Sequence, residues 1–423
     1  MTTTRRRFRV ISATGLALTA LLAASACGGE SQDEADGKKT LRMLVNVTPA
    51  LPVTFYEDLV APFEQAHPGV DVKIEAPTAA TGNVQETLTQ QLAAGTEPDL
   101  LGGQTTAAEA KVMATLPNEP WVTDTPFAKE LQIDSRQWTV GASFQAQSLV
   151  FYNKDAFQKA GIAAPPATVD EFTAVLKKIK QAGGYTPLET AGEWVTAAQF
   201  QQLANAVVMQ NEPNWYSKRT KGEVTFANSD YKRYVEVYKS WIDDGLVSKN
   251  ANGVKYNDSL VDFTSGKAAT YVMGNWAVPT IDQAKPKFGV GVFAAPSFDG
   301  KPVPQVGGAG DLYSVLNSSK HKAEAFELVK YLVSDKAAVQ KQLVAEGNFR
   351  TGFSYQASPL TQEVQKIVDA APGAVVAGDG FGDNTAPSGW SAELTKILQK
   401  LYLGDSAEQA IAAMDKWWTG NAR

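Results

Sequence analysis

The feature that most constrains the fold of this chain is a regular alternation of strand-like and helix-like segments. Residues 41–47 form a short apolar run, and apolar residues then recur at helical spacing across residues 53–69, which end in Pro-Gly. Residues 70–75 alternate apolar and polar, and residues 81–95 again place apolar residues on one helical face before a glycine. This repeated order predicts an α/β architecture in which helices flank central sheets.

A later helix carries its own start and stop signals. Thr168 is followed three residues later by Glu171, the spacing of a capping box, and Gly183-Gly184 closes the segment. The residues between them form an apolar stripe at helical spacing: Phe172, Val175, Leu176 and Ile179. We therefore expect a helix that begins just after Thr168 and ends before Gly183.

The N-terminus has the pattern of an export signal. Residues 1–26 combine four arginines and no acidic residue with a short apolar run that ends in small residues. The run is too short and too rich in alanine to favour a retained membrane-spanning helix. The block Thr4–Phe8 resembles a twin-arginine signal, which would mean export of the folded protein. An ordinary signal with three adjacent arginines explains the same residues, and both routes stay open.

The only cysteine of the chain, Cys27, directly follows the predicted signal. Residues 24–27 read Ala-Ser-Ala-Cys and resemble a lipobox, in which the cysteine sulfur is acylated with chains such as palmitate. The alternative is a small buried cysteine, but the following residues are polar, lack apolar periodicity and offer nothing to bury it. We expect a lipid anchor at Cys27 and a flexible tether over residues 27–40. A single cysteine also excludes an internal disulfide.

Charge and length narrow the class of protein further. Removal of residues 1–26 would change the net charge from −6 to −10, which argues against nucleic acid or an anionic surface as partner. The remainder is longer than one hydrophobic core usually organises, so two lobes are expected. The two histidines, His67 and His321, lie in no zinc pattern, and no phosphate-binding or dinucleotide-binding glycine motif is present. We expect neither a metal nor a cofactor.

Five segments in order give the chain a recognisable family resemblance. They read FEQAHPGVDVKIE, QQLAAGTEPDLL, LVFYNKDAFQKAGIAAPPATVDEF, FTSGKAATYVMGNWA and NSSKHKAEAFELVKYLVSD. Together they resemble the extracellular carbohydrate-binding lipoproteins of ABC importers, relatives of maltose-binding protein. The resemblance implies a two-lobed periplasmic-binding-protein-like fold of type II, with the ligand cleft between the lobes. It places residues 41–147 plus 306–350 in the first lobe and residues 150–300 plus 353–423 in the second.

The resemblance also implies a function. A sugar, which we expect to be a neutral oligosaccharide, would draw the two lobes together and pass to the transmembrane subunits of an ABC permease. The protein itself would be a monomer held at the outer face of the membrane by its lipid, and not an enzyme. The arginine-rich signal, the many alanines and the lipobox suit a Gram-positive host.

Tryptophans are the first candidates for sugar contact, because an indole matches the apolar face of a pyranose ring. Of the nine tryptophans, Trp276 follows a Gly-Asn turn where relatives carry a stacking tryptophan. Trp390 precedes a predicted helix, and Trp194 lies in a loop, again where relatives present aromatic residues. For each of the three, packing in a core is the alternative.

Polar candidates complete the expected site. Asn46 ends the first predicted strand, Gln104 follows a later strand, and Asp311 lies in a glycine-rich turn. Gln145 and Gln147 point to the same side if extended, and their amides would suit sugar hydroxyls. Turn formation or a solvated face is the alternative for these residues. Maltose-binding relatives can carry an aromatic and an acidic residue near Gln104, and the glycines and threonines found here argue against maltose as the ligand.

Two other classes remain open from sequence alone. A secreted glycoside hydrolase would share the export signal and the aromatic residues, and it needs two opposed carboxylates. With 45 acidic residues the sequence does not exclude such a pair, although none lies in a hydrolase motif. The third class is a binding lipoprotein for a non-sugar solute, since one fold serves many ligands.

Overall fold

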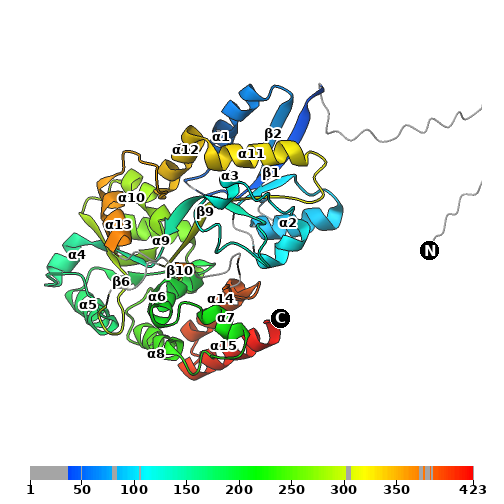
Figure 1. Cartoon of the computed structure of the whole chain (residues 1–423). Coiled ribbons are helices and arrows are strands. Elements are labelled where there is room, and N and C mark those ends of the chain that lie inside the picture. The colour runs from blue at the N-terminus through cyan, green and yellow to red at the C-terminus, as the bar shows by residue number, and fades with distance from the viewer. Residues whose placement is uncertain are drawn as a thin grey trace, which may run out of the picture.

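The protein consists of two α/β lobes, each built around its own sheet (Figure 1). The structure is a computed structural model that describes residues 37–48, 50–78, 83–103, 106–301, 306–370, 375–376, 382 and 384–422. The predicted signal, Cys27 and Gln104 lie outside the described residues. Residues 1–26 and Cys27 therefore remain sequence predictions.

The sheet of the first lobe is mixed and follows the order β10-β9-β3-β1-β2, with β4 also paired to β9. Its strands are β1 (Lys39–Val45), β2 (Val70–Glu75), β3 (Leu100–Gly102), β4 (Val140–Ala146), β9 (Val306–Val315) and β10 (Val375–Val376). Strands β1, β2 and β3 run parallel, whereas β9 runs antiparallel to β3 and β4. The carboxyl ends of the parallel strands therefore share one edge, the usual place for a ligand in an open α/β sheet.

The sheet of the second lobe has four strands in the order β6-β7-β5-β8. They are β5 (Leu149–Asn153), β6 (Thr186–Glu189), β7 (Ala268–Met273) and β8 (Val290–Ala294). All six residues of β7 are buried, and only one residue of β5 is partly exposed. Such continuous burial requires helices on both faces of the sheet.

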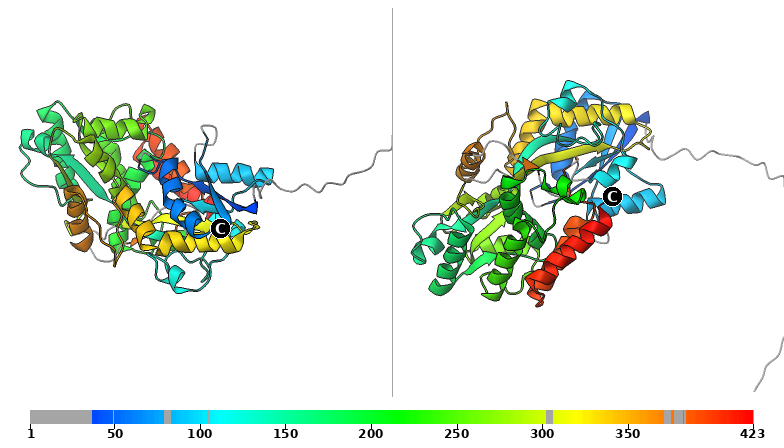
Figure 2. Two further views of the ribbon diagram at one scale, coloured as in Figure 1. Left: turned by 90° about the horizontal axis from the view of Figure 1, so that it is seen from above. Right: turned by 60° about the horizontal axis from the view of Figure 1, so that its bottom comes forward.

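Helices cover both sheets (Figures 1 and 2). Those of the first lobe are α1 (Val53–Ala66), α2 (Val84–Ala94), η2 (Ala107–Val112), α3 (Pro120–Thr123), α11 (Lys322–Ser334) and α12 (Lys336–Glu346). The remaining helices are α4 (Lys154–Lys159), α5 (Val169–Ala182), α6 (Val195–Asn211), α7 (Trp215–Thr220), α8 (Asp230–Asp243), η3 (Ala251–Gly253), α9 (Tyr256–Thr264), η4 (Asn275–Ala277), α10 (Val278–Ala284), α13 (Pro359–Ala370), α14 (Trp390–Tyr402) and α15 (Ala407–Asn421). Within the described ranges, no helix combines the length and apolar character needed to span a membrane.

Local signals in the sequence set several boundaries. The Thr168 hydroxyl accepts the Glu171 amide, and the Glu171 carboxylate accepts the Thr168 amide, which confirms the predicted capping box of α5. Helix α2 ends at Gly95, whose φ of 66° lies in the left-handed region that favours glycine. Helix α1 ends at Ala66, slightly before the Pro-Gly pair predicted to end it.

The chain passes between the lobes through short crossing segments. β4 pairs with β9 in the first sheet, and after only Gln147 and Ser148 the chain enters β5, at the middle of the second sheet. A second crossing follows α12, where Phe349 forms an isolated bridge with Phe144 of β4. Residues 353–423 were predicted to belong to the second lobe, but one short segment of this range pairs with the first sheet. This segment is the two-residue strand β10, which joins β9, a pairing too short to leave a periodic signal.

Candidate functional site

Three aromatic side chains of the second lobe lie together next to the crossing segments. The Trp194 and Tyr256 rings are 4.9 Å apart at an interplanar angle of 44°. Burial, with the charge of Glu346 as a smaller cause, raises the pKa of Tyr256 to about 12, while a hydrogen bond with Trp276 acts in the opposite direction. Trp194 is 43% exposed, an unusual exposure for so large an apolar ring. These residues offer an aromatic surface with one face open to a ligand.

The turn after β7 determines where Trp276 lies. A Cβ atom on Gly274 would approach the Trp276 ring to 2.0 Å at Cζ3 and 2.4 Å at Cε3. The indole therefore folds back over the backbone of residue 274, where only glycine leaves room. Trp276 is half-buried, so one part of the ring packs against the lobe while another part is accessible.

The polar half of the site comes from the first lobe and the second crossing. Ser143 Oγ donates to Asp311 Oδ2 at 2.6 Å, and Gln145 Nε2 donates to Glu346 Oε2 at 2.9 Å. Asn348 Nδ2 lies 3.1 Å from Asp311 Oδ2 and 3.2 Å from Glu346 Oε2, so one amide reaches both carboxyl groups. We call Asp311 and Glu346 the acid pair.

Glu346 is buried and Asp311 is partly buried, and neither has a compensating cation. Among the described residues, no lysine, arginine or histidine forms an ion pair with either carboxylate. Burial raises the pKa of Glu346 to about 8, with the nearby charge of Asp311 as the second cause, and burial also raises the pKa of Asp311. Asp311 has a φ of 50° within β9, a conformation that costs energy for a residue with a side chain. Charged and strained groups of this kind concentrate at functional sites.

The carboxyl end of β1 approaches the same region. The Tyr56 hydroxyl donates to the backbone oxygen of Asn46 at 2.8 Å. Burial raises the pKa of Tyr56 well above its ordinary value, and the charges of Asp311 and Glu346 raise it further. Asn46 itself is exposed. Tyr56 therefore connects the end of β1 with the acid pair.

The structure brings together four of the residues proposed from sequence: Trp276, Trp194, Gln145 and Asp311. Asn46 lies at the edge of this group, and Gln147 is half-buried in the first crossing. Their contacts with a ligand remain predictions.

Trp390 lies elsewhere, which corrects the expectation that it faces the ligand. It is 2% exposed and packs against Phe226 and Trp418 at ring distances of 5.1 Å. Trp390 is the first residue of α14, and its indole lies in the core of the second lobe. Burial of this large apolar surface stabilises the fold.

Four residues of this group were not predicted from the sequence as site residues: Tyr56, Tyr256, Glu346 and Asn348. They lie in α1, in α9, at the end of α12 and in the second crossing, and none stands in a motif. The only local signal was the glycine between Glu346 and Asn348, which adopts the left-handed conformation that ends α12. Their proximity arises from contacts between residues about 200 positions apart, such as Gln145 with Glu346.

Glu346→Gln is expected to flatten the dependence of stability on pH. Because the pKa of Glu346 is raised from 4.5 to about 8 on folding, the folded state retains a proton that the unfolded state releases, and stability falls as pH rises through this window. One pKa unit corresponds to about 1.4 kcal/mol, so the wild type should lose on the order of a few kcal/mol between pH 5 and 8. Thermal unfolding at several pH values measures this loss.

The control is Glu363→Gln, which removes a carboxylate from an exposed ion pair with Lys154. This variant should keep the slope of the wild type. If Glu346→Gln keeps the same slope too, Glu346 is not the group that holds the proton.

Two hollows lie apart from this group. One, of about 710 Å³, is lined by aromatic side chains that include Phe127, Phe144, Phe349, Phe353 and Tyr355. Phe144 lies between Ser143 and Gln145 on β4, so this groove is on the opposite face of the strand from the acid pair. The other, of about 470 Å³, includes Phe63, His67 and Trp121 on the first lobe. Neither contains a residue proposed from sequence, and no three potential metal ligands cluster within the described ranges.

Comparison with known sequences identifies relatives along most of the chain. The family profile described as bacterial extracellular solute-binding protein matches residues 48–339. The multiple sugar-binding protein of Streptococcus mutans is 33% identical over 229 residues, which are 52% of this chain and 53% of that protein. The melibiose/raffinose/stachyose-binding protein MelE of Bacillus subtilis is 23% identical over 343 residues, 79% of each chain.

Comparison with solved structures supports the fold. A chitin oligosaccharide binding protein superposes with a TM-score of 0.76 at 22% identity, over 91% of this chain and 99% of that one. The type II two-lobed fold expected from sequence is therefore confirmed.

Proposed function

This chain belongs to the family of bacterial extracellular solute-binding proteins, and we propose that it captures a neutral oligosaccharide outside the cell and delivers it to an ABC permease. The observation that carries the proposal is the convergence of two kinds of group from two lobes. Trp194, Tyr256 and Trp276 offer an aromatic surface, while Asp311 and Glu346 offer carboxyl oxygens.

Each half of the site matches one property of a sugar. The C–H face of a pyranose ring stacks on an indole, and its hydroxyls donate to carboxylate oxygens. Asp311 and Glu346 use only Oδ2 and Oε2 in hydrogen bonds with the described residues, which leaves Oδ1 and Oε1 for a ligand. Because Glu346 holds a proton up to about pH 8, the negative charge of the acid pair lies on Asp311, and this charge disfavours an anionic ligand.

Binding at this place would link the two lobes. Trp276 belongs to the second lobe and Asp311 to the first, so a sugar that contacts both stabilises the arrangement in which they are close. A closed, loaded form is then distinguishable from an empty one, which gives the permease subunits a surface to recognise.

We further propose that residues 1–26 are removed on export and that lipid on Cys27 anchors the monomeric protein to the outer face of a Gram-positive membrane. The tether would end where β1 begins. There Lys39 forms an ion pair with Glu324 of α11, and this contact holds the start of the fold against the first lobe. The export route is either the general or the twin-arginine pathway.

Isothermal titration of the protein lacking residues 1–27 tests the proposal. The panel contains melibiose, raffinose, stachyose and N,N′-diacetylchitobiose, with glucose 6-phosphate as an anionic comparison. We expect saturable binding of at least one neutral sugar at roughly micromolar concentration and no binding of the phosphate. Release of smaller sugars would indicate a hydrolase instead, and binding of the phosphate alone would move the proposal to a non-sugar solute.

A further inference from the structure

A buried asparagine precedes the aromatic ring of Trp276 and makes contacts with both crossing segments. Asn275 is 0% exposed, and its Oδ1 accepts the backbone N–H of Ala146 at 2.6 Å. Its Nδ2 lies 3.0 Å from the backbone oxygen of Glu346 and 2.9 Å from that of Gly347. Ala146 ends β4 before the first crossing, and Gly347 begins the second crossing. One side chain therefore joins the Trp276 turn to both connections between the lobes.

A second buried asparagine continues this connection to the acid pair. Asn275 Nδ2 donates to Asn348 Oδ1 at 2.8 Å. Asn348, also 0% exposed, directs its own Nδ2 to Ser143 Oγ at 3.0 Å and to the carboxylates of Asp311 and Glu346. The path from Trp276 to the acid pair thus runs through two amides. We call Asn275 and Asn348 the asparagine relay.

The relay has little freedom to rearrange. An asparagine amide has one oxygen acceptor and two N–H donors, and both side chains use the oxygen and the nitrogen together. Buried polar networks of this kind fix geometry, because a broken contact leaves an unsatisfied group in a medium of low dielectric. A displacement of either crossing would therefore shift Trp276 relative to Asp311 and Glu346.

We propose that Asn275 and Asn348 are positioning residues that set the separation between Trp276 and the acid pair, and thereby the length of ligand that fits between them. The inference rests on the proposed function and deepens it. The relay touches the groups that would contact the sugar without needing to contact the sugar itself. The asparagine relay thereby determines which chain lengths in a series of related sugars bind.

The test measures length preference in Asn275→Ala and Asn348→Ala. Melibiose, raffinose and stachyose form a series of two, three and four rings, and the N-acetylchitooligosaccharides form another. In the series that the wild type binds, each variant should lose at least tenfold in affinity for the preferred length. The ratio of Kd values between the preferred length and its neighbours should fall toward one, an effect that loss of stability alone does not produce.

Asn153→Ala is the matched control. Asn153 is also buried, at 1% exposure, but its side chain caps α4 by accepting the amides of Asp155 and Ala156. The control should lower Tm while it leaves the Kd ratios unchanged. If Asn275→Ala does not fold, Asn275→Ser retains an oxygen acceptor for the Ala146 amide and takes its place.

Two failures are distinguishable. If the wild type binds sugar and both relay variants keep its Kd ratios, the relay is only structural and the inference is wrong. If the wild type binds no sugar of either series, the proposed function fails and the inference fails with it.

Discussion

Gly274→Ala is expected to weaken sugar binding by about thirtyfold or more, as much as removal of the Trp276 ring itself. The new Cβ would lie 2.0 Å from Trp276 Cζ3 and 2.4 Å from Cη2, distances at which the ring must leave its place. A tryptophan that anchors a ligand typically contributes about 2 kcal/mol or more, which corresponds to the stated factor. Titration calorimetry with the panel sugar that the wild type binds measures the loss.

The comparison with Trp276→Ala separates this mechanism from general damage. If Gly274→Ala acts only by displacing the ring, the double variant should lose no more affinity than Trp276→Ala alone. Gly420→Ala is the control, because a Cβ at that position meets no atom within 4 Å. Unchanged affinity in Gly274→Ala, with the fold intact, would show that the position of the Trp276 ring is not needed for binding.

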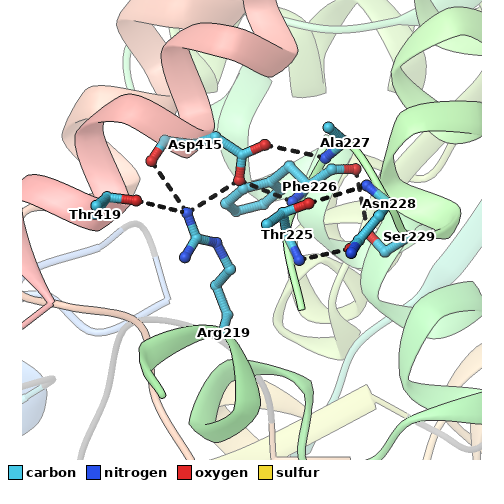
Figure 3. A network of polar contacts seen from close by, with 8 residues as sticks. All are labelled: Arg219, Thr225, Phe226, Ala227, Asn228, Ser229, Asp415 and Thr419. Atoms are coloured by element: carbon cyan, nitrogen blue, oxygen red, sulfur yellow. Dashed lines mark hydrogen bonds and ion pairs between the residues drawn. The ribbon is translucent and has the colours of Figure 1, made fainter. Parts of the chain in front are cut away.

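Asp415→Ala is expected to lower the free energy of unfolding by about 3–5 kcal/mol, because it leaves a buried cation unpaired. Arg219 is 4% exposed, and its guanidinium donates at 3.0 Å to Asp415 Oδ1, at 3.1 Å to the Asp415 backbone oxygen and at 3.1 Å to Thr419 Oγ1 (Figure 3). Asp415 also accepts the backbone amides of Phe226 and Ala227 at 2.9 and 3.1 Å. Its loss therefore leaves the Phe226 and Ala227 amides without these acceptors and the Arg219 cation without its counter-charge.

Chemical denaturation measures this effect, and two variants bracket it. Asp415→Asn keeps an oxygen acceptor but removes the charge, so it should lose less than Asp415→Ala. Lys416→Ala, at the exposed neighbouring position of α15, should change stability by less than about 0.5 kcal/mol. Sugar affinity should stay near the wild-type value in all three, since this network contains no residue of the proposed site. A loss in Asp415→Ala no larger than that in Lys416→Ala would show that the ion pair with Arg219 does not stabilise the fold.

Local signals predicted much of the fold. The capping box at Thr168, the glycine after α2 and the alternation of residues 70–75 each act within a few residues, so the sequence alone locates them. The turn beneath Trp276 is also indicated locally, because Gly274 precedes the tryptophan by two residues and leaves room for its ring.

Trp390 shows where local reasoning ends. Like Trp276, it lies close after a glycine and near the start of a helical segment, yet Phe226 and Trp418 cover it because they reach it from distant segments. The same limit explains why the acid pair was only half predicted. Asp311 stood out in a glycine-rich turn, whereas Glu346 became a candidate only once Asn348 was seen to hold both carboxylates.

A crystal structure of the protein with the preferred panel sugar would show directly which residues contact the ligand. We expect a sugar ring stacked on Trp276, with hydroxyls within hydrogen-bond distance of Asp311 or Glu346. Sugar bound instead in the groove lined by Phe144 and Phe353, on the other face of β4, would contradict this expectation.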